Sequence, residues 1–204
     1  MPLTAMQLFA QFNVPYAGTA PWGTRFVELR QGIYIVSTSS DPTLNSGILP
    51  ACTISQTAFT TWLTHAPVMQ VNKLPATFIT VQAELNRYWY PTENILYIGK
   101  ADRPIADRVT NFYRHQLGKD SPHGGGQWIK ALNNLLQLHV HYGVCANSPF
   151  IEFQMLKFFA EHTSGLPFHS IAQPANHIPF ANREIKHDGY SCRKKHGFTK
   201  ACSV

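Results

Sequence analysis

The chain has 204 residues, of which 44% are hydrophobic, so it can bury a full core and is not a disordered tail. Four cysteines do not make a disulfide scaffold and predict a reducing, cytoplasmic environment; no basic segment of a secretory signal opens the chain, and no apolar run approaches the roughly 20 residues that span a bilayer. Lysine and arginine outnumber aspartate and glutamate by 17 to 11, and the formal charge of +6 favours an anionic partner.

The first half of the chain predicts helix, strand and a long segment of mixed pattern. Residues 4–12 fit a short amphipathic helix, and residues 31–37 fit a strand because β-forming residues follow one another there. Within the segment 44–92, residues 55–65 have apolar side chains at helical spacing. Residues 81–90 fit a helix or a strand equally well.

The middle of the chain predicts a strand that leads directly into a helix. Residues 95–99 form the strand, which Gly99 ends. Asp102 is a suitable N-cap for a helix over residues 103–117. A second, shorter helix is expected over residues 128–136.

The last third predicts a third strand, a helix and a basic tail. Apolar and polar residues alternate over residues 137–144, as in a strand, and residues 149–162 have a helical pattern. The tail, residues 174–204, is rich in Asn, His, Lys and Arg and is expected to be mostly loop. Three strands with helices packed on them predict an α+β fold.

Two tripeptides in the predicted strands carry the functional argument. The sequence GIY occupies residues 32–34, and YIG occupies residues 97–99 immediately before the helix that bears Arg108. Together with Glu152 on a later helix, these motifs resemble those of the GIY-YIG nuclease family.

The resemblance covers residues 30–37 and 94–184. It implies a single domain, 1–204, whose small three-stranded antiparallel sheet is flanked by helices. In this chain 62 residues separate the two motif tyrosines, more than is usual in the family, and this separation implies that 44–92 is an insertion between the first two strands.

The resemblance also implies a chemical role for each motif residue. Tyr34 and Tyr97 face one cleft, where Tyr97 deprotonates or orients the attacking water. Lys100 and Arg108 lower the pKa of a phenol, which is about 10 when free, and hold the phosphate. Glu152 binds one Mg²⁺ or Mn²⁺, because a hard cation prefers oxygen ligands. The alternative for both tyrosines is a place among the half-buried aromatics of a sheet.

One family position lacks its usual side chain. Relatives often place His or Tyr four residues after the arginine, where this chain has Phe112. At about 100° per residue His115 lies on the same helix flank as Arg108, and we expect it to substitute in proton transfer. Tyr113 falls on the other flank.

Asparagine and acidic residues near the motifs offer rival assignments. Asn182 matches the asparagine that relatives place after the glutamate helix, and Asn176 is its rival. Glu161 is the weaker rival of Glu152 for the metal. A loop-capping role is the alternative for the asparagine, and a first-turn helix acid is the alternative for Glu152.

The tail and one glycine-rich loop leave further alternatives open. Arg193, Lys194 and Lys195 are expected to meet DNA phosphates. Zinc is a less favoured use of the tail, and it would take the set His187, Cys192, His196 and Cys202. The run Gly124-Gly125-Gly126 lacks the Lys-Ser or Lys-Thr of a nucleotide-binding loop, so with His123 it is either a linker or a loop that touches DNA.

These observations predict a divalent-metal-dependent endonuclease that acts on double-stranded DNA. Restriction-type cleavage is the favoured biology by analogy, with the insertion and its aromatics Trp62, Trp89 and Tyr90 as the place for target recognition or as a structural cap. A nucleic-acid-binding protein without catalysis and a repair or structure-specific nuclease are the alternatives. The sequence by itself gives neither the oligomeric state, for which a dimer is one option, nor a preference for DNA over RNA.

Overall fold

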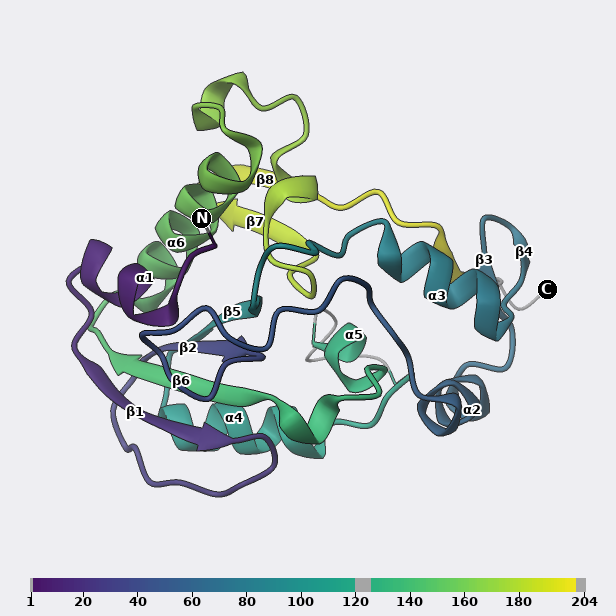
Figure 1. Cartoon of the computed structure of the whole chain (residues 1–204), viewed down its shortest axis with the longest axis horizontal. Helices are drawn as coiled ribbons and strands as arrows, with labels where there is room; N and C mark the ends of the chain where they lie inside the picture. Colours follow the sequence, from purple (N-terminus) through teal and green to yellow (C-terminus); the bar gives the residue numbers. More distant parts are fainter. Residues whose placement is uncertain (1, 120–125, 201–204) are drawn as a thin grey trace.

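A four-stranded antiparallel sheet lies at the centre of the chain, whose computed structural model describes residues 2–119 and 126–200 (Figure 1). In spatial order its strands are β1 (Tyr16–Pro21), β6 (His139–Val144), β2 (Gly32–Ser37) and β5 (Ile95–Ala101). The α+β class is therefore confirmed, and the three predicted strands pair in the order β6-β2-β5. The prediction of a three-stranded sheet is wrong, because β1 adds a fourth strand beside β6.

The sheet has a separate core on each face. Tyr34 and Val36 of β2 pack toward α4 (Ile105–Arg114), whereas Ile33 and Ile35 pack toward α1 (Ala5–Gln11) and α6 (Ser148–Ser164). Figure 1 shows α4 on one side of the sheet and α1 and α6 on the other. Successive side chains of a strand point to opposite faces, so β2 contributes to both cores. Every residue of β2 is buried because both faces of the sheet are covered.

The connection from β5 to α4 differs from the prediction at both ends. The strand does not end at Gly99 but continues to Ala101, and Asp102 does not cap the helix. The N-cap residue is Pro104, and the first N–H groups of α4 donate instead to the backbone carbonyls of Glu28 and Arg30. The helix ends at Arg114 and does not reach residue 117.

The insertion forms a lobe beside the sheet, at the right of Figure 1. Its elements are α2 (Gln56–His65), β3 (Met69–Val71), β4 (Leu74–Pro75) and α3 (Phe78–Asn86). The helix at 55–65 is confirmed, with Ser55 as its N-cap, and the ambiguous segment is a helix because Thr77 and Thr80 form a capping box at its start. Buried residues of α2 and α3 belong to the same hydrophobic core as Tyr34.

The short helix predicted at 128–136 is divided into two. It comprises α5 (Gln127–Lys130) and the 3₁₀ turn η1 (Leu135–Gln137). Between them Leu132 forms a β-bridge with Ile54, and the N–H of Asn133 donates to the carbonyl of Thr53. These backbone groups bond to the insertion and are not free for the hydrogen bonds of a continuous helix.

The tail is not mostly loop. Two 3₁₀ turns, η2 (Phe168–Ser170) and η3 (Pro174–His177), precede a hairpin of β7 (Glu184–His187) and β8 (Tyr190–Arg193), and β9 (Phe198–Lys200) pairs with β3 of the insertion. Asp188 and Gly189 turn the hairpin with φ of 46° and 80°, the positive values that a tight two-residue hairpin requires. Among the described residues, no helix combines the length and apolarity needed to cross a bilayer.

Candidate active site

The two motif tyrosines lie against each other on one face of the sheet. Tyr34 on β2 pairs with Gly99 on β5, and the ring centroids of Tyr34 and Tyr97 are 5.8 Å apart. Only glycine fits at position 99, because a Cβ there would come within 2.5 Å of both tyrosine rings. The two tripeptides therefore form one packing unit in which the glycine of the second makes room for the tyrosine of the first.

The outer edge of β5 is closed by side chains and backbone from later parts of the chain. The Asn182 amide accepts from the N–H of Ile98 at 2.9 Å and donates to its carbonyl at 2.7 Å. One Glu152 oxygen accepts from the N–H of Lys100 at 3.2 Å, and the N–H of Ala181 donates to the carbonyl of Leu96. These bonds pair an edge that would otherwise be open, and they bring α6 and the tail to β5.

Glu152 is placed by the second turn of α6, not by the first turn as a capping acid would be. Burial raises the pKa of its carboxyl group to about 7, and the neighbouring Asp102 adds to this effect, while Lys100 and Arg108 oppose it. A carboxylate has room for about four hydrogen bonds or metal bonds, so the bond from Lys100 leaves capacity for a cation. A half-buried carboxylate that lines a cavity fits a hard divalent ion held by a single protein oxygen.

Lys100 and Asp102 form the rim of the site next to Glu152. The Lys100 ammonium is 3.5 Å from the Asp102 carboxylate, and the Ser148 hydroxyl donates to the same carboxylate at 2.7 Å. Asp102 thus links the start of α6 to the end of β5. Lys100, Asp102 and Arg108 line one open hollow of about 380 Å³ on this rim.

Arg108 lies close to the two phenols, as predicted. The pKa values of the phenols are nevertheless raised, whereas the sequence predicted that they would be lowered. Burial raises the pKa of Tyr34 to about 12 and that of Tyr97 well above its usual value, and the guanidinium of Arg108 offsets this only in part. Lys100 lowers the pKa of Glu152. No described group completes a hydrogen bond of regular geometry with the buried Tyr34 hydroxyl. Both phenols are therefore neutral near pH 7.

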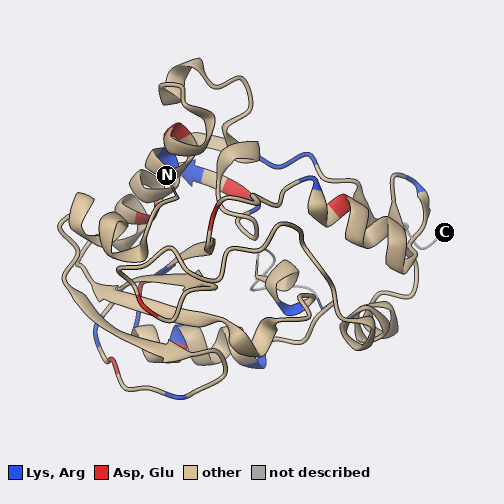
Figure 2. Cartoon of the chain, viewed as in Figure 1, with Lys and Arg blue, Asp and Glu red and all other residues tan. Residues whose placement is uncertain are grey.

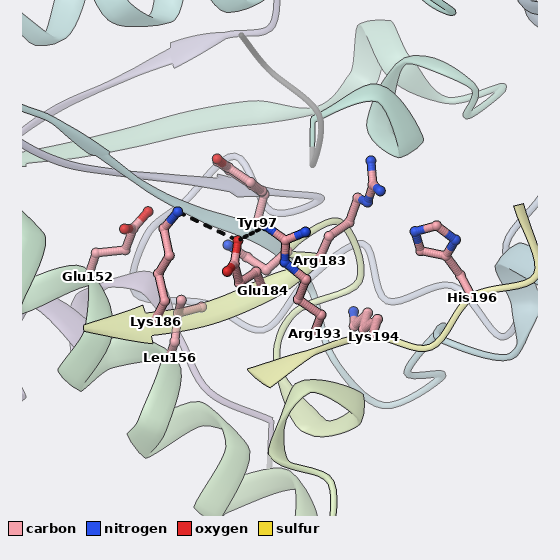
Figure 3. Close-up of a pocket in the computed structure, with 10 residues that line it drawn as sticks. Tyr97, Glu152, Leu156, Arg183, Glu184, Lys186, Arg193, Lys194 and His196 are labelled. Atoms are coloured by element: carbon pink, nitrogen blue, oxygen red, sulfur yellow. Dashed lines mark hydrogen bonds and ion pairs between the residues drawn. The ribbon is translucent and has the colours of Figure 1, made fainter. Parts of the chain in front are cut away.

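A cavity of about 370 Å³ opens beside Tyr97 and Glu152 (Figure 3). Its other walls come from the segment 182–196, which contains the hairpin. Basic side chains dominate these walls, with Glu184 as the acidic exception: Arg183, Lys186, Arg193, Lys194 and His196. A second hollow of similar volume lies on the other side of Glu152 and shares Lys186 with the first.

His115 is not brought to the site. It follows the last residue of α4 and has non-helical backbone angles, and it lies about 10 Å along the helix axis from Arg108. Its ring contacts the Gln127 side chain at 3.3 Å, and its carbonyl accepts from Lys130. The N–H of His115 still donates to the carbonyl of Asn111, so His115 keeps its helix flank, but its ring lies against Gln127; its role as a substitute proton donor stays a prediction.

The rival residues have structural positions of their own. Glu161 accepts a hydrogen bond from the N–H of Phe168 at 2.9 Å and so holds the turn after α6. Asn176 is exposed in η3, where its carbonyl accepts from the Tyr90 hydroxyl. The Asn182 side chain holds β5 through both backbone groups of Ile98, and Asn182 also lines the cavity described above, so its contact with substrate stays a prediction.

The three basic residues predicted to meet DNA separate in the structure. Arg193 is exposed and lines the cavity, and Lys195 is exposed outside it. Lys194 is buried, with its ammonium bonded to the carbonyls of Pro179 and Phe180 at 2.9 Å each. Lys194 therefore fixes the turn before Asn182, and the prediction that it binds DNA is wrong.

The proposed zinc residues do not converge where the structure describes them. His187 stacks on Phe153 of α6, and His196 packs against Trp128. Among the described residues there is no group of three or more His, Cys, Asp or Glu placed to hold a metal. Cys202 and residues 123–125 of the glycine-rich loop, with His123, lie outside the described residues.

The insertion aromatics serve the core. Trp62 and Trp89 are each 7% exposed, and the indole of Trp89 donates to the carbonyl of Leu49. Tyr90 is half-buried and bonds to η3. This burial agrees with the structural-cap alternative for these three side chains.

Sequence reasoning missed the hairpin, its basic residue Lys186 and Arg183, the residue before the hairpin. The pair Asp188-Gly189 is a strong signal for a two-residue hairpin, and it could have located β7 and β8. Asp102 was assigned to helix capping, whereas it lies within reach of Lys100 and Glu152.

Comparisons of this chain with protein-family models, with curated proteins and with solved structures found no match.

Proposed function

We propose that this chain is a divalent-metal-dependent endonuclease that hydrolyses phosphodiester bonds of double-stranded DNA. The observation that carries the proposal is the convergence of five chemically suited residues from distant parts of the chain. They come from β2, β5, α4 and α6 and meet around the edge of β5: Tyr34, Tyr97, Lys100, Arg108 and Glu152.

Glu152 is the residue that would hold the cation, Mg²⁺ or Mn²⁺. When bound, such a cation polarises the scissile phosphate and stabilises the oxygen that leaves. Asp102 is the acid that raises the pKa of Glu152, and it is engaged by Lys100 and Ser148. The site thus fits the one-glutamate arrangement that the GIY-YIG resemblance implies.

Tyr97 is the phenol in contact with the cavity, and it acts by orienting the attacking water. Its raised pKa keeps it protonated near neutral pH, so it can donate a hydrogen bond while its oxygen accepts one. The ring of Tyr34 packs against it and fixes its direction.

Arg108 and Lys100 supply the positive charge for the phosphate. A guanidinium forms paired hydrogen bonds with phosphate oxygens, and it stabilises the negative charge that develops on them. Both side chains line the same hollow at the rim, so one phosphate can reach both.

Plasmid nicking tests this proposal against its alternatives. Purified protein with Mg²⁺ should convert supercoiled plasmid to nicked or linear DNA, and a chelator should stop the reaction. Binding without nicking would favour the second candidate, a nucleic-acid-binding protein without catalysis. The observation that supports this candidate is Phe112, which stands where relatives often have His or Tyr. Preference for branched over intact duplex would indicate a structure-specific nuclease, and restriction-type activity requires sequence-specific double-strand cuts.

A further inference from the structure

The wall of the cavity opposite the catalytic residues is positively charged. Arg183, Lys186 and Arg193 line it together with Glu184, and the side chains of Lys186 and Arg193 are 68% and 72% exposed. Figure 2 shows Lys and Arg, in blue, on the hairpin and on the segment that follows it. Since these positions lie 31 or more residues after Glu152, only the fold brings them to the site.

Glu184 holds two of these cations in place. Its carboxylate is 3.2 Å from the Arg193 guanidinium and 3.6 Å from the Lys186 ammonium, and it accepts from the Ser191 hydroxyl at 2.9 Å (Figure 3). The same carboxylate oxygen, Oε2, thus forms ion pairs with both Arg193 and Lys186. An anion that entered from the cavity would find two donors already directed to a single negatively charged position.

The hairpin that carries Lys186 and Arg193, and that Arg183 directly precedes, packs against α6. Phe153 stacks on His187 with ring centroids 5.3 Å apart, and Tyr190 packs against both Phe153 and Phe168. The distance between the basic wall and Glu152 is therefore set by packing and not by a free loop. Lys186 also lines the hollow on the other side of Glu152, so it stands between the two openings.

We infer that this cavity is a second phosphate subsite, in which Arg183, Lys186 and Arg193 bind the phosphate next to the one that is cleaved. The inference rests on the proposed function for the identity of its ligand, a nucleic-acid strand. On binding, the phosphate takes the donors that Glu184 holds in the free protein. Glu184 competes with an incoming anion for these donors. An anion that contacts only one cation therefore binds poorly, whereas a phosphate that contacts all three can displace the carboxylate.

Metal-free binding to a labelled DNA duplex at several salt concentrations tests the subsite without any cleavage. Lys186→Gln and Arg193→Gln should each weaken binding about fivefold and reduce the salt slope by about 1. Glu184→Gln should strengthen binding about threefold, because a neutral amide competes less for the donors. Arg25→Gln, an exposed arginine outside the cavity lining, is the control for general charge and should change binding least. Inorganic phosphate in the millimolar range should compete with DNA for wild type and less for Arg193→Gln.

Nicking by the same variants separates the two proposals. If they cut plasmid at the wild-type maximal rate but need more DNA for half-saturation, the subsite is supported. If wild type cuts DNA while Lys186→Gln and Arg193→Gln bind and cut like Arg25→Gln, the subsite is wrong and the nuclease stands. If these variants lose DNA or phosphate affinity while wild type never cuts, the cavity binds phosphate, but the nuclease and the place of this site beside a cleaved phosphate are both wrong. Weaker binding by Glu184→Gln would overturn the displacement of Glu184.

Discussion

The Asn182 side chain bonds to both backbone groups of Ile98, in the way that a neighbouring β-strand would. Ile98 is adjacent to Tyr97, so a residue from the tail sets the position of the phenol that lines the cavity. Lys194 in turn holds the turn that carries Asn182, through the carbonyls of residues 178–180. The tail is thus part of the site and not an appendage to it.

Asn182→Ala should therefore destabilise the fold by about 2–4 kcal/mol, because it leaves two buried backbone groups of Ile98 without partners. Urea unfolding measures the change. Asn176→Ala, at an exposed position, is the matched control and should stay within about 0.5 kcal/mol of wild type. Equal stability of the two variants would mean that the bonds to Ile98 contribute nothing to folding.

Arg108→Ala should lower the rate of DNA nicking by about 10²–10³ while the protein still folds, since the charge that stabilises the phosphate is lost. His115→Ala should change the rate less than tenfold, because His115 lies past the end of α4 and away from the phenols. Rates at saturating DNA with both variants decide the matter. A larger loss in His115→Ala would restore the role that the sequence suggested for it.

The two tyrosines should also differ in effect. Tyr97→Phe removes the hydroxyl that lines the cavity, and nicking should fall by about 10². Tyr34→Phe removes a buried hydroxyl outside the cavity lining and should lower the rate less than Tyr97→Phe does. The comparison of single-turnover rates tests this, and an equal loss in both variants would show that the two phenols act as one unit.

His141 should make the fold sensitive to acid. Its neutral ring bonds to Thr19 at 2.6 Å and to the Ser39 carbonyl at 3.1 Å, and burial lowers its pKa to about 4. A histidine with a lowered pKa in the folded state contributes stability above its unfolded pKa of about 6.5 that is lost as the pH falls toward 4.

This group alone should remove about 3 kcal/mol of unfolding free energy between pH 7 and pH 4. Urea midpoints of wild type and His141→Gln at both pH values measure it, with His169→Gln, at an exposed position, as the control. If wild type and His141→Gln lost stability in parallel, His141 would not be the group responsible.

How far the sequence predicts this fold depends on how local its signals are. The strand at 32–37 and the helix at 56–65 follow from local patterns and capping residues, and both were predicted. Strand β1 was missed because Gly18 and Pro21 are poor strand formers. Gly18 is there to leave room for Tyr142, since a Cβ would come 2.5 Å from its hydroxyl, and Pro21 is tolerated because β1 is an edge strand.

For the site, the sequence predicts the residues within motifs but not those that depend on tertiary contacts. Tyr34, Tyr97, Arg108 and Glu152 were found by motif and spacing, and the structure brings them together. His115 keeps the helix flank that its spacing predicts, since its N–H donates to the carbonyl of Asn111, but its ring contacts Gln127, and spacing along the chain does not report such a tertiary contact. The burial that raises the pKa of both phenols and of Glu152 is a property of the packed core, which spacing along the chain does not report.

The most direct test of a one-glutamate nuclease compares plasmid nicking by Glu152→Gln and Glu161→Gln in Mg²⁺ at equal DNA occupancy. Glu152→Gln keeps the shape of the side chain and its bond to Lys100 but removes the negative charge, so both variants should fold and bind DNA. Cleavage by Glu152→Gln should fall by about 10³ or more, while Glu161→Gln, whose residue only holds the turn at Phe168, should cut nearly as well as wild type. Full activity in Glu152→Gln would contradict the account.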